Sequence, residues 1–425
     1  MPQISQNQTQ TAILEVSERS CSTYFMRILH LSTSLTGGAG IAALRTHYSL
    51  LSAGADSTLV SLSKSLSATN SYPKVEHLAR IFPEKFMSFL LTRAQRSLLQ
   101  NGPYLQTPLS LGVSPKRLKI DKYDLIHIHS MYNLINYSTL SRILKTNIPV
   151  VITLHDQRLT TGGCHGSMGC TNYLKNCRNC PQVYKYAQPL VSRSSNRLTS
   201  LINSHFDNIL LIAPSDWIKE ISNLQFPKVK SKLIFNCVEE KYFSIEKIKK
   251  NQNVNSRISI GFASIDIHNS YKGLRTLLQA LDLLEEARSN YRLVLFGNGD
   301  LSKKIENLDI LRLGEVKGEN FLRAMSEIDV LIVPSDQDNL PNVMCEALCL
   351  GVPVIGSRVG GIPFVLDKFN LPVFTAGRFK ELAKILSDVD MIRSLEVEKN
   401  LAKEMFSPYV HANNLLSSYA EITSA

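Results

Sequence analysis

The stretch PSDQDNLPNVMCEALCLGVPVIGSRVGGIP, residues 334–363, combines an acidic loop, a helix pattern and a short apolar strand. Pro341 suits the first helical position, because its missing N–H would be unpaired there anyway. Asn339 is a candidate helix cap. Gly351 closes the helix pattern and Pro353 prevents the helix from continuing. The stretch therefore predicts an acidic turn that leads into a helix and then into a buried strand.

Two carboxylates, Asp338 and Glu346, lie on either side of the predicted helix start. A carboxylate can accept hydrogen bonds from two neighbouring hydroxyls, and a sugar and a ribose each present such pairs. The amides at a helix start favour a phosphate. A ligand with a sugar, a diphosphate and a ribose in a row would use all of these groups. From the isolated acids alone, the alternative is two solvated carboxylates on a surface turn.

Outward from this stretch, short apolar strands alternate with helix patterns in two series. The first series begins with MRILHLS and a glycine-rich turn, and the second begins with ISIGFAS and the helix pattern SYKGLRTLLQALDLLEEA. Such alternation implies parallel sheets that are covered on both faces. The sequence therefore predicts an α/β protein with two Rossmann-like domains, whose strand ends face each other across a ligand cleft.

The domain boundaries follow from the two series and from the polar, basic run between them. We expect a flexible extension over residues 1–25, an N-terminal domain over 26–240, a linker over 241–256 and a C-terminal domain over 257–403. The last segment, 404–425, is expected to be a helix that crosses back to the N-terminal domain. The extension lacks the basic start and apolar core of a signal peptide, so we expect a cytoplasmic protein.

The composition fits a folded protein of 425 residues, of which 44% are apolar and 20% are charged. No window offers the roughly 18 uninterrupted apolar residues of a membrane span. The formal net charge of +11 is scattered along the chain. Nucleic acid and an anionic membrane surface would both be consistent with this charge. No aromatic and basic binding motif accompanies it, which argues against nucleic acid.

A cluster of cysteines lies in residues 160–182, a segment called here the cysteine loop. Four of the eight cysteines of the chain fall in it: Cys164, Cys170, Cys177 and Cys180. Four thiolates can hold a tetrahedral zinc ion, and such a structural site could hold together a loop that lacks its own core. The five-residue gap between the first two cysteines is unusual for zinc modules, and His165 could replace one thiolate. Free thiols packed in a loop are the alternative.

Three histidines follow apolar strand patterns. His127 and His129 occupy alternate positions at a strand end. They could be metal ligands, but polar residues that face the cleft are the preferred interpretation. His155 ends another apolar strand and precedes Asp156, and as an isolated histidine it could be either structural or part of the cleft.

The segment DNLPNVMCEALCLGVPVIGSRVGGIPFVL resembles the signature of the retaining glycosyltransferases of family four, which have the GT-B fold. The resemblance extends from about Arg27 to Ile422. Five further matches lie along the chain: the glycine loop in RILHLSTSLTGGAG, TLHDQRLTTGGCH of a bacterial polysaccharide and lipopolysaccharide subgroup, APSDW, SYKGLRTLLQAL and FGNGD. One such match would be weak, whereas six in the right order are strong.

The resemblance implies roles in binding a nucleotide-diphosphate-sugar donor. Glu346 is expected on the ribose hydroxyls, Asp338 on the donor sugar and Lys272 against the diphosphate. His155 is expected near the reacting carbon, which makes it a catalytic candidate together with the two acids. The other implied donor-binding residues are Gly37, Gly38, Gly297, Asn339, Leu340 and Asn342.

Two positions depart from the family pattern. The first acid is usually Glu, so Asp338 is one methylene shorter, and an Arg that often precedes the lysine is replaced by Ile267. The triplet from Asp336 to Asp338 also matches a short Asp-x-Asp metal motif of another glycosyltransferase fold. The surrounding pattern is that of GT-B, whose members generally work without such a metal. We therefore expect no cofactor in catalysis.

The resemblance implies an enzyme that moves a sugar with retention from its donor to a glycan or lipid-linked glycan bound by the N-terminal domain. Cell-envelope polysaccharide synthesis, at the inner face of a membrane, is the expected setting. Two alternatives remain open. One is a nucleotide-sugar epimerase or hydrolase on the same fold, and the other is a carbohydrate- or membrane-binding protein whose active site has decayed.

Overall fold

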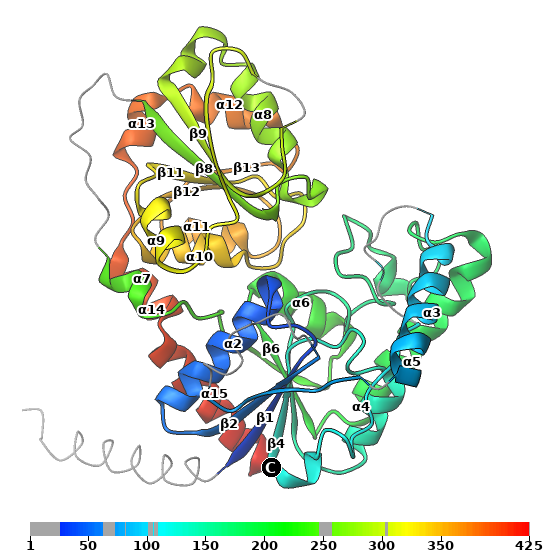
Figure 1. The fold of residues 1–425 in the computed structure, drawn as a ribbon. Coiled ribbons are helices and arrows are strands. Elements are labelled where there is room, and N and C mark those ends of the chain that lie inside the picture. Colours follow the sequence, from blue (N-terminus) through cyan, green and yellow to red (C-terminus); the bar gives the residue numbers. More distant parts are fainter. Residues whose placement is uncertain are drawn as a thin grey trace, which may run out of the picture.

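The computed structural model describes residues 26–62, 73–80, 82–100, 105, 109–245, 257–301 and 305–424. The predicted extension over residues 1–25 lies outside the described residues, as does most of the predicted linker. Figure 1 shows two α/β bodies, one built from the first half of the chain and one from the second, with the red C-terminal helix lying on the first body. None of the described helices is long and apolar enough to cross a membrane.

The N-terminal domain contains a seven-stranded, wholly parallel sheet in the order β3-β2-β1-β4-β5-β6-β7. Its central strands are buried and largely apolar, with one histidine in each of two strands, because helices cover both faces. The strands are β1 (Arg27–Ser32), β2 (Asp56–Ser61), β3 (Val75–His77), β4 (Leu125–Ile128), β5 (Val150–Thr153), β6 (Ile209–Ala213) and β7 (Lys230–Leu233).

Helices α4, α5 and α6 pack on one face of this sheet, and α2 and α15 pack on the other. The helices of this domain are α2 (Gly37–Ser52), α3 (Phe82–Leu98), α4 (Tyr137–Leu144), α5 (Gln188–Ser204), α6 (Asp216–Gln225) and the C-terminal α15 (Pro408–Thr423). Short 3-10 helices lie at η2 (Ile120–Lys122), η3 (Asn172–Lys175) and η4 (Lys185–Ala187).

The C-terminal domain contains a six-stranded parallel sheet in the order β10-β9-β8-β11-β12-β13. Its strands are β8 (Ile258–Asp266), β9 (Tyr291–Asn298), β10 (Asp309–Gly314), β11 (Val330–Val333), β12 (Val354–Ser357) and β13 (Val373–Phe374). In both sheets the first strand is central and the chain order reverses beside it. The prediction of two Rossmann-like domains is therefore confirmed.

Helices α9, α10, α11 and α14 cover one face of the second sheet, and α8, α12 and α13 cover the other. The helices are α7 (Lys241–Ser244), α8 (Leu274–Asp282), α9 (Gly318–Ser326), α10 (Asn342–Cys349), α11 (Ile362–Lys368), α12 (Phe379–Leu386), α13 (Val389–Ser394) and α14 (Lys399–Phe406), with 3-10 turns η5 (Ser270–Lys272) and η6 (Glu285–Asn290).

The chain crosses between the domains earlier than expected. Ile234 still belongs to the N-terminal core, whereas Val238 and Tyr242 belong to the C-terminal core. The start of the expected linker, residues 241–245, therefore includes a helix with a buried tyrosine. The polar side chains that suggested a linker lie on the exposed side of this turn. The polar sequence pattern therefore gave no sign that Tyr242 is buried in the C-terminal core.

The return crossing divides the expected C-terminal helix into two. Helix α14 ends at Phe406, which is buried in the C-terminal core, and Ser407 caps α15 by accepting from the Val410 amide at 3.3 Å. A helix is disfavoured directly before a proline, and Pro408 sets the break. The two crossings lie side by side, since the Val238 amide donates to the Phe406 carbonyl at 2.9 Å.

Candidate active site

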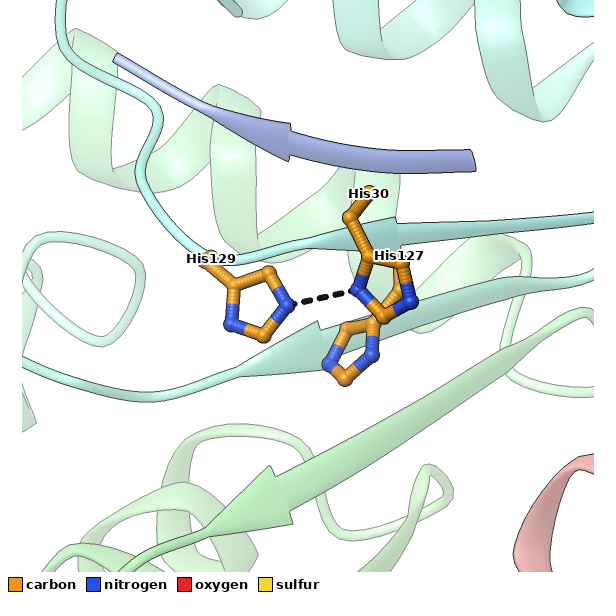
Figure 2. A group of neighbouring side chains, drawn as sticks. All are labelled: His30, His127 and His129. Atoms are coloured by element: carbon orange, nitrogen blue, oxygen red, sulfur yellow. Dashed lines mark hydrogen bonds between the residues drawn. The ribbon is translucent and has the colours of Figure 1, made fainter. Parts of the chain in front are cut away.

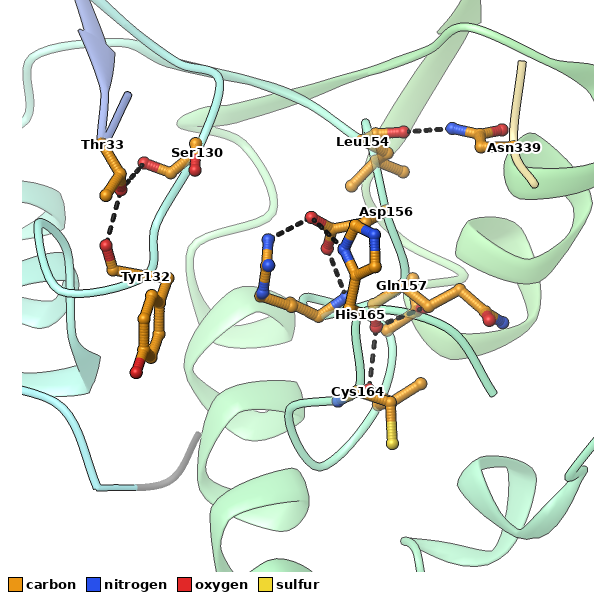
Figure 3. A network of polar contacts seen from close by, with 12 residues as sticks. Thr33, Ser130, Tyr132, Leu154, Asp156, Gln157, Cys164, His165 and Asn339 are labelled. Carbon is orange, nitrogen blue, oxygen red and sulfur yellow. Dashed lines mark hydrogen bonds and ion pairs between the residues drawn. The ribbon is translucent and has the colours of Figure 1, made fainter. Parts of the chain in front are cut away.

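The acidic loop, residues 334–341, connects β11 to α10 next to the point where the strand order reverses. Helix α10 begins at Asn342, and Pro341 is the residue before its first turn rather than part of it. Asn339 does not cap this helix. Its side chain crosses to the N-terminal domain, where it donates to the Leu154 carbonyl at 2.7 Å and accepts from Ser215 Oγ at 2.5 Å (Figure 3 shows the first contact).

Glu346 is held by a residue that the sequence did not single out. Arg45 Nη2 of α2 donates to Glu346 Oε1 at 2.7 Å and to Glu239 Oε2 at 2.9 Å. The side chains of Arg45 and Glu346 are only 6% and 9% exposed. Burial opposes the charge of Arg45, but the two carboxylates outweigh it and raise the pKa of the guanidinium. The second acid of the signature is therefore buried and joined to the opposite domain.

Asp338 and Lys272 form a second ion pair, within the C-terminal domain. Lys272 Nζ lies 2.6 Å from Asp338 Oδ2, to which Ser335 Oγ also donates at 3.2 Å. Burial would lower the pKa of Lys272, but Asp338 raises it above its usual value. The pair lines a small recess at the ends of β8 and β11. An anionic group of a ligand could therefore bind the Lys272 ammonium in this recess in place of Asp338.

The glycine loop after β1 faces the start of α10. Gly37 opens α2 with φ of +76°, and a Cβ atom there would meet nothing within 4 Å. No side chain caps this helix, so its first amides are available to an anion. Asn342 Nδ2 donates to the Gly38 carbonyl at 3.0 Å and so joins the loop to α10.

Gly297 and Leu340 have evident packing roles. A Cβ atom on Gly297 would lie 1.7 Å from the Ser264 carbonyl oxygen, so the close approach of β9 to β8 requires glycine. Leu340 is 6% exposed and belongs to the C-terminal core. Only its backbone could therefore contact a ligand.

The Gly-Gly-Ile-Pro turn packs against the acidic loop. A Cβ atom on Gly360 would lie 1.9 Å from the Asp338 carbonyl oxygen, and one on Gly361 would lie 2.4 Å from Ser215 Cβ. The Gly361 amide donates to the Asn339 carbonyl at 2.7 Å. These two glycines let the turn, the acidic loop and the N-terminal domain come into contact.

The histidines form a buried, hydrogen-bonded row rather than a set of residues that face the cleft. His30 Nδ1 and His129 Nε2 are 2.9 Å apart (Figure 2), and His129 Nδ1 is 3.2 Å from His155 Nε2. His127 is fully buried between Thr153 and the Tyr419 hydroxyl. The cleft-facing interpretation of His127 and His129 was wrong, because Tyr419 of α15 covers His127 and because His129 is buried between His30 and His155.

His155 ends this row at the junction with the second domain. Burial lowers its pKa to about 4, so the imidazole is neutral near pH 7. Asp156 beside it pairs with Arg158 and lies 3.4 Å from His165 Nδ1 (Figure 3). Burial would raise the pKa of Asp156, but these two partners lower it below its usual value. His155 could thus donate or accept one hydrogen bond, while Asp156 is already bound.

The four cysteines of the cysteine loop line one small cavity. Their sulfurs are unbridged thiols, and Cys170 is the most exposed of them. Burial raises the pKa of Cys164, Cys177 and Cys180. The loop lies beside the cleft, since the Met168 amide donates to Gln337 Oε1 of the acidic loop at 3.1 Å.

Comparison with known proteins gives matches over both domains. Residues 257–389 match the model described as glycosyl transferases group 1, and residues 36–242 match that of glycosyltransferase family 4. The putative colanic acid biosynthesis glycosyl transferase WcaC of Escherichia coli is 23% identical over 81% of this chain and 86% of its own length. An uncharacterized protein from the cps region of Klebsiella pneumoniae is 23% identical over 72% and 80%.

Solved structures agree on the fold. HepE of Anabaena, crystallised with UDP, has a TM-score of 0.59 at 16% identity, covering 93% of this chain and all of its own. Sucrose-phosphate synthase of Thermosynechococcus elongatus has a TM-score of 0.64 at 16% identity, covering 94% and 99%. Two parallel-sheet domains of this kind make up the GT-B fold, and the two family models cover both of them. The chain belongs to the GT-B glycosyltransferases, as the resemblance implied.

Proposed function

We propose that the protein transfers a sugar, with retention, from a nucleoside-diphosphate-sugar donor to a glycan or lipid-linked glycan. The observation that carries this proposal is the convergence of four groups at one junction. Glu346 can accept from ribose hydroxyls, Lys272 can balance a diphosphate, and the uncapped start of α2 at Gly37 can add amides to it. Asp338, released from Lys272 when phosphate arrives, can then accept from the donor sugar.

Retention rests on the family resemblance, and the surroundings of His155 favour one of its two mechanisms. A double displacement would need a free carboxylate close to the reacting carbon. The nearest carboxylate in sequence, Asp156, is already paired with Arg158 and His165. Same-face substitution uses the departing phosphate as the base for the acceptor hydroxyl instead. Positioning and charge stabilisation then lower the barrier.

The names of several relatives support a polysaccharide product. One relative is named for colanic acid biosynthesis, and a lipopolysaccharide 1,2-N-acetylglucosaminetransferase of Salmonella typhimurium is 27% identical over 48% of this chain and 59% of its own length. Acceptors of this type are extended and polar or are anchored to a lipid. We place the acceptor on the N-terminal domain, next to the cysteine loop.

The exposed side chains of helix α3 favour a lipid surface as the place where the enzyme acts. Its solvent side carries phenylalanines, with Phe82, Phe86 and Phe89 exposed by 80%, 55% and 62%. The inner side includes the buried Gln95, so the apolar side of this helix faces outward. Exposed basic residues of the same helix are Lys85, Arg93 and Arg96. Apolar rings flanked by cations suit an anionic bilayer, to which we assign this face.

A donor panel tests the proposal. Purified protein is heated with UDP, GDP, ADP and CMP and with their sugar conjugates, and a specific rise in melting temperature identifies the base. The chosen donor is then incubated with and without acceptor glycans. Acceptor-dependent product with retained configuration supports the proposal. Turnover without acceptor would indicate an epimerase or hydrolase, and binding without turnover would indicate a decayed enzyme.

A further inference from the structure

The cysteine loop brings four sulfurs, separated in sequence, to the wall of one small cavity. We propose that these sulfurs bind one structural zinc ion. The proposed ligands are Cys164, Cys170, Cys177 and Cys180. Soft thiolates in a set of four suit tetrahedral zinc.

Amide groups already point at the sulfurs. The Gly162 amide donates to Cys177 Sγ at 3.0 Å, and the Asn172 amide lies 3.4 Å from Cys170 Sγ. An N–H donor stabilises a thiolate more than a neutral thiol, because the bond is then charge-assisted. Such second-layer donors fix the direction of a metal ligand.

A third sulfur accepts from a side-chain amide, since Gln182 Nε2 donates to Cys164 Sγ at 3.2 Å. Three of the four sulfurs therefore accept from N–H groups, which simple packing of small apolar residues would not require.

The loop has little else to hold it. Its own hydrophobic cluster is small and counts three of the cysteines among its buried members. Regular structure within the loop amounts to the short 3-10 helix η3. Left-handed backbone conformations occur at Met168, Asn176, Cys177 and Asn179, and such conformations persist only where the surroundings enforce them. One ion with four bonds would supply that constraint.

The histidine group is the rival metal site. Among the described residues, one nitrogen each of His30, His127 and His129 lie within 4.8 Å of one another, whereas no three of the cysteine sulfurs lie so close and the sulfurs would have to move together to bind an ion. However, both nitrogens of His127 and both nitrogens of His129 are already hydrogen-bonded. A metal there would have to break these buried contacts, so the cysteines are preferred.

The zinc site would shape the cleft as well as the loop. Gln337 precedes Asp338 and touches the loop through the Met168 amide. Gly166 also packs on Gln337, since a Cβ atom there would lie 2.8 Å from Gln337 Cγ. Loss of the ion should loosen this contact between the domains and leave the ion pairs of the donor site in place.

The test measures zinc content in the full-length protein, so it does not depend on the proposed transferase activity. Protein is purified under reducing conditions, supplied with zinc, freed of loose metal and analysed by native mass spectrometry. Wild type should hold about one zinc per chain, and the variant with all four cysteines replaced by serine should hold none. The control Cys237→Ala, a buried cysteine outside the loop, should keep its zinc. Cobalt-loaded wild type should show thiolate-to-cobalt absorption that the four-serine variant lacks.

A single Cys170→Ser variant covers the case in which the four-serine variant does not fold. It should lose at least about tenfold in zinc affinity in a chelator competition. A His127→Asn variant should retain the ion. Zinc that survives loss of the cysteines but disappears from the His127→Asn variant would overturn the proposal. Reduced wild type without zinc, or with a disulfide between Cys177 and Cys180 in freshly purified protein, would overturn it as well.

Discussion

Arg45 and Glu346, 301 positions apart in sequence, form a buried ion pair of 2.7 Å that joins α2 of the first domain to α10 of the second. The acid expected to bind a ribose is thus tied to the glycine-loop helix. Donor binding and the contact between the domains therefore depend on the same carboxylate.

The first prediction concerns this pair. Glu346→Gln should lower the affinity for nucleoside diphosphate by roughly ten- to a hundredfold, because one charge-assisted hydrogen bond is worth about 1.5–3 kcal/mol. Arg45→Met should destabilise the fold by about 3–5 kcal/mol, because it leaves a buried charge unpaired. Calorimetry measures the affinity of the Glu346→Gln variant, and urea unfolding measures the stability of the Arg45→Met variant. The surface pair of Arg27 and Asp124 is the control, and Arg27→Met should cost much less than Arg45→Met because solvent screens an exposed pair. Equal costs for both arginines would contradict the account.

The second prediction separates the two acids. Asp338→Asn removes the partner of Lys272, whose ammonium then remains available to phosphate. Nucleoside diphosphate should bind this variant at least as well as wild type, whereas the sugar-bearing donor should bind more weakly. Isothermal calorimetry with both ligands gives the comparison, and a chelator should change neither result. If Asp338→Asn abolishes diphosphate binding, and divalent metal restores it in chelated wild type, the acid is a metal ligand.

The third prediction uses two glycines with similar backbone angles. Gly360 has φ of +55° and Gly318 has φ of +59°. Alanine at Gly318 meets open space, so only the conformational cost of roughly 1–2 kcal/mol applies. Alanine at Gly360 must also displace the Asp338 carbonyl. Donor affinity, measured by thermal shift, should therefore fall in Gly360→Ala and stay unchanged in Gly318→Ala. Equal donor affinity in the two variants would show that the turn does not position the acidic loop.

The fourth prediction is acid sensitivity from the buried histidines. Burial lowers the pKa of His155 and His411 to about 4 and the pKa of His30, His127 and His129 well below 6.5. The unfolded chain takes up protons from about pH 6.5 downward, but the folded chain does not. Stability is therefore fully present above pH 6.5 and is lost as the pH falls toward 4, by on the order of 3 kcal/mol per group at most.

Urea unfolding at several pH values measures this loss. The exposed His268 supplies the control, since His268→Gln should keep the wild-type pH profile. A free energy of unfolding that stays constant between pH 7 and pH 4.5 would show that the row is already protonated or is not buried in solution.

The fifth prediction concerns the outer face of α3. Wild type should sediment with vesicles of phosphatidylcholine and phosphatidylglycerol, and salt should weaken the binding. A variant with Phe86→Ser and Phe89→Ser should bind more than tenfold more weakly, because each buried ring is worth about 1.5–3 kcal/mol. Leu224→Ser, which changes a 68% exposed side chain of α6, should bind like wild type. Equal binding to neutral and anionic vesicles would argue against the assignment.

The sequence alone determined the two-domain architecture and the class of enzyme. Alternating short strands and helices leave little choice of sheet type, because parallel strands need crossover helices. Motifs such as the glycine loop and the acidic loop are local. Their residues lie close together in sequence, so the motif can be identified from the spacing of these residues. The alternation also gave the strand ends, and therefore the general place of the site.

Only the tertiary structure decided which partner each charged group has. The pairing of Arg45 with Glu346 spans the two domains, and nothing in the helix pattern around Arg45 distinguishes it from a solvated arginine. In the same way, His127 lies inside because α15, far away in sequence, covers its strand with Tyr419. Long-range packing sets the burial of a polar group, and burial decides whether that group is solvated, paired or neutral.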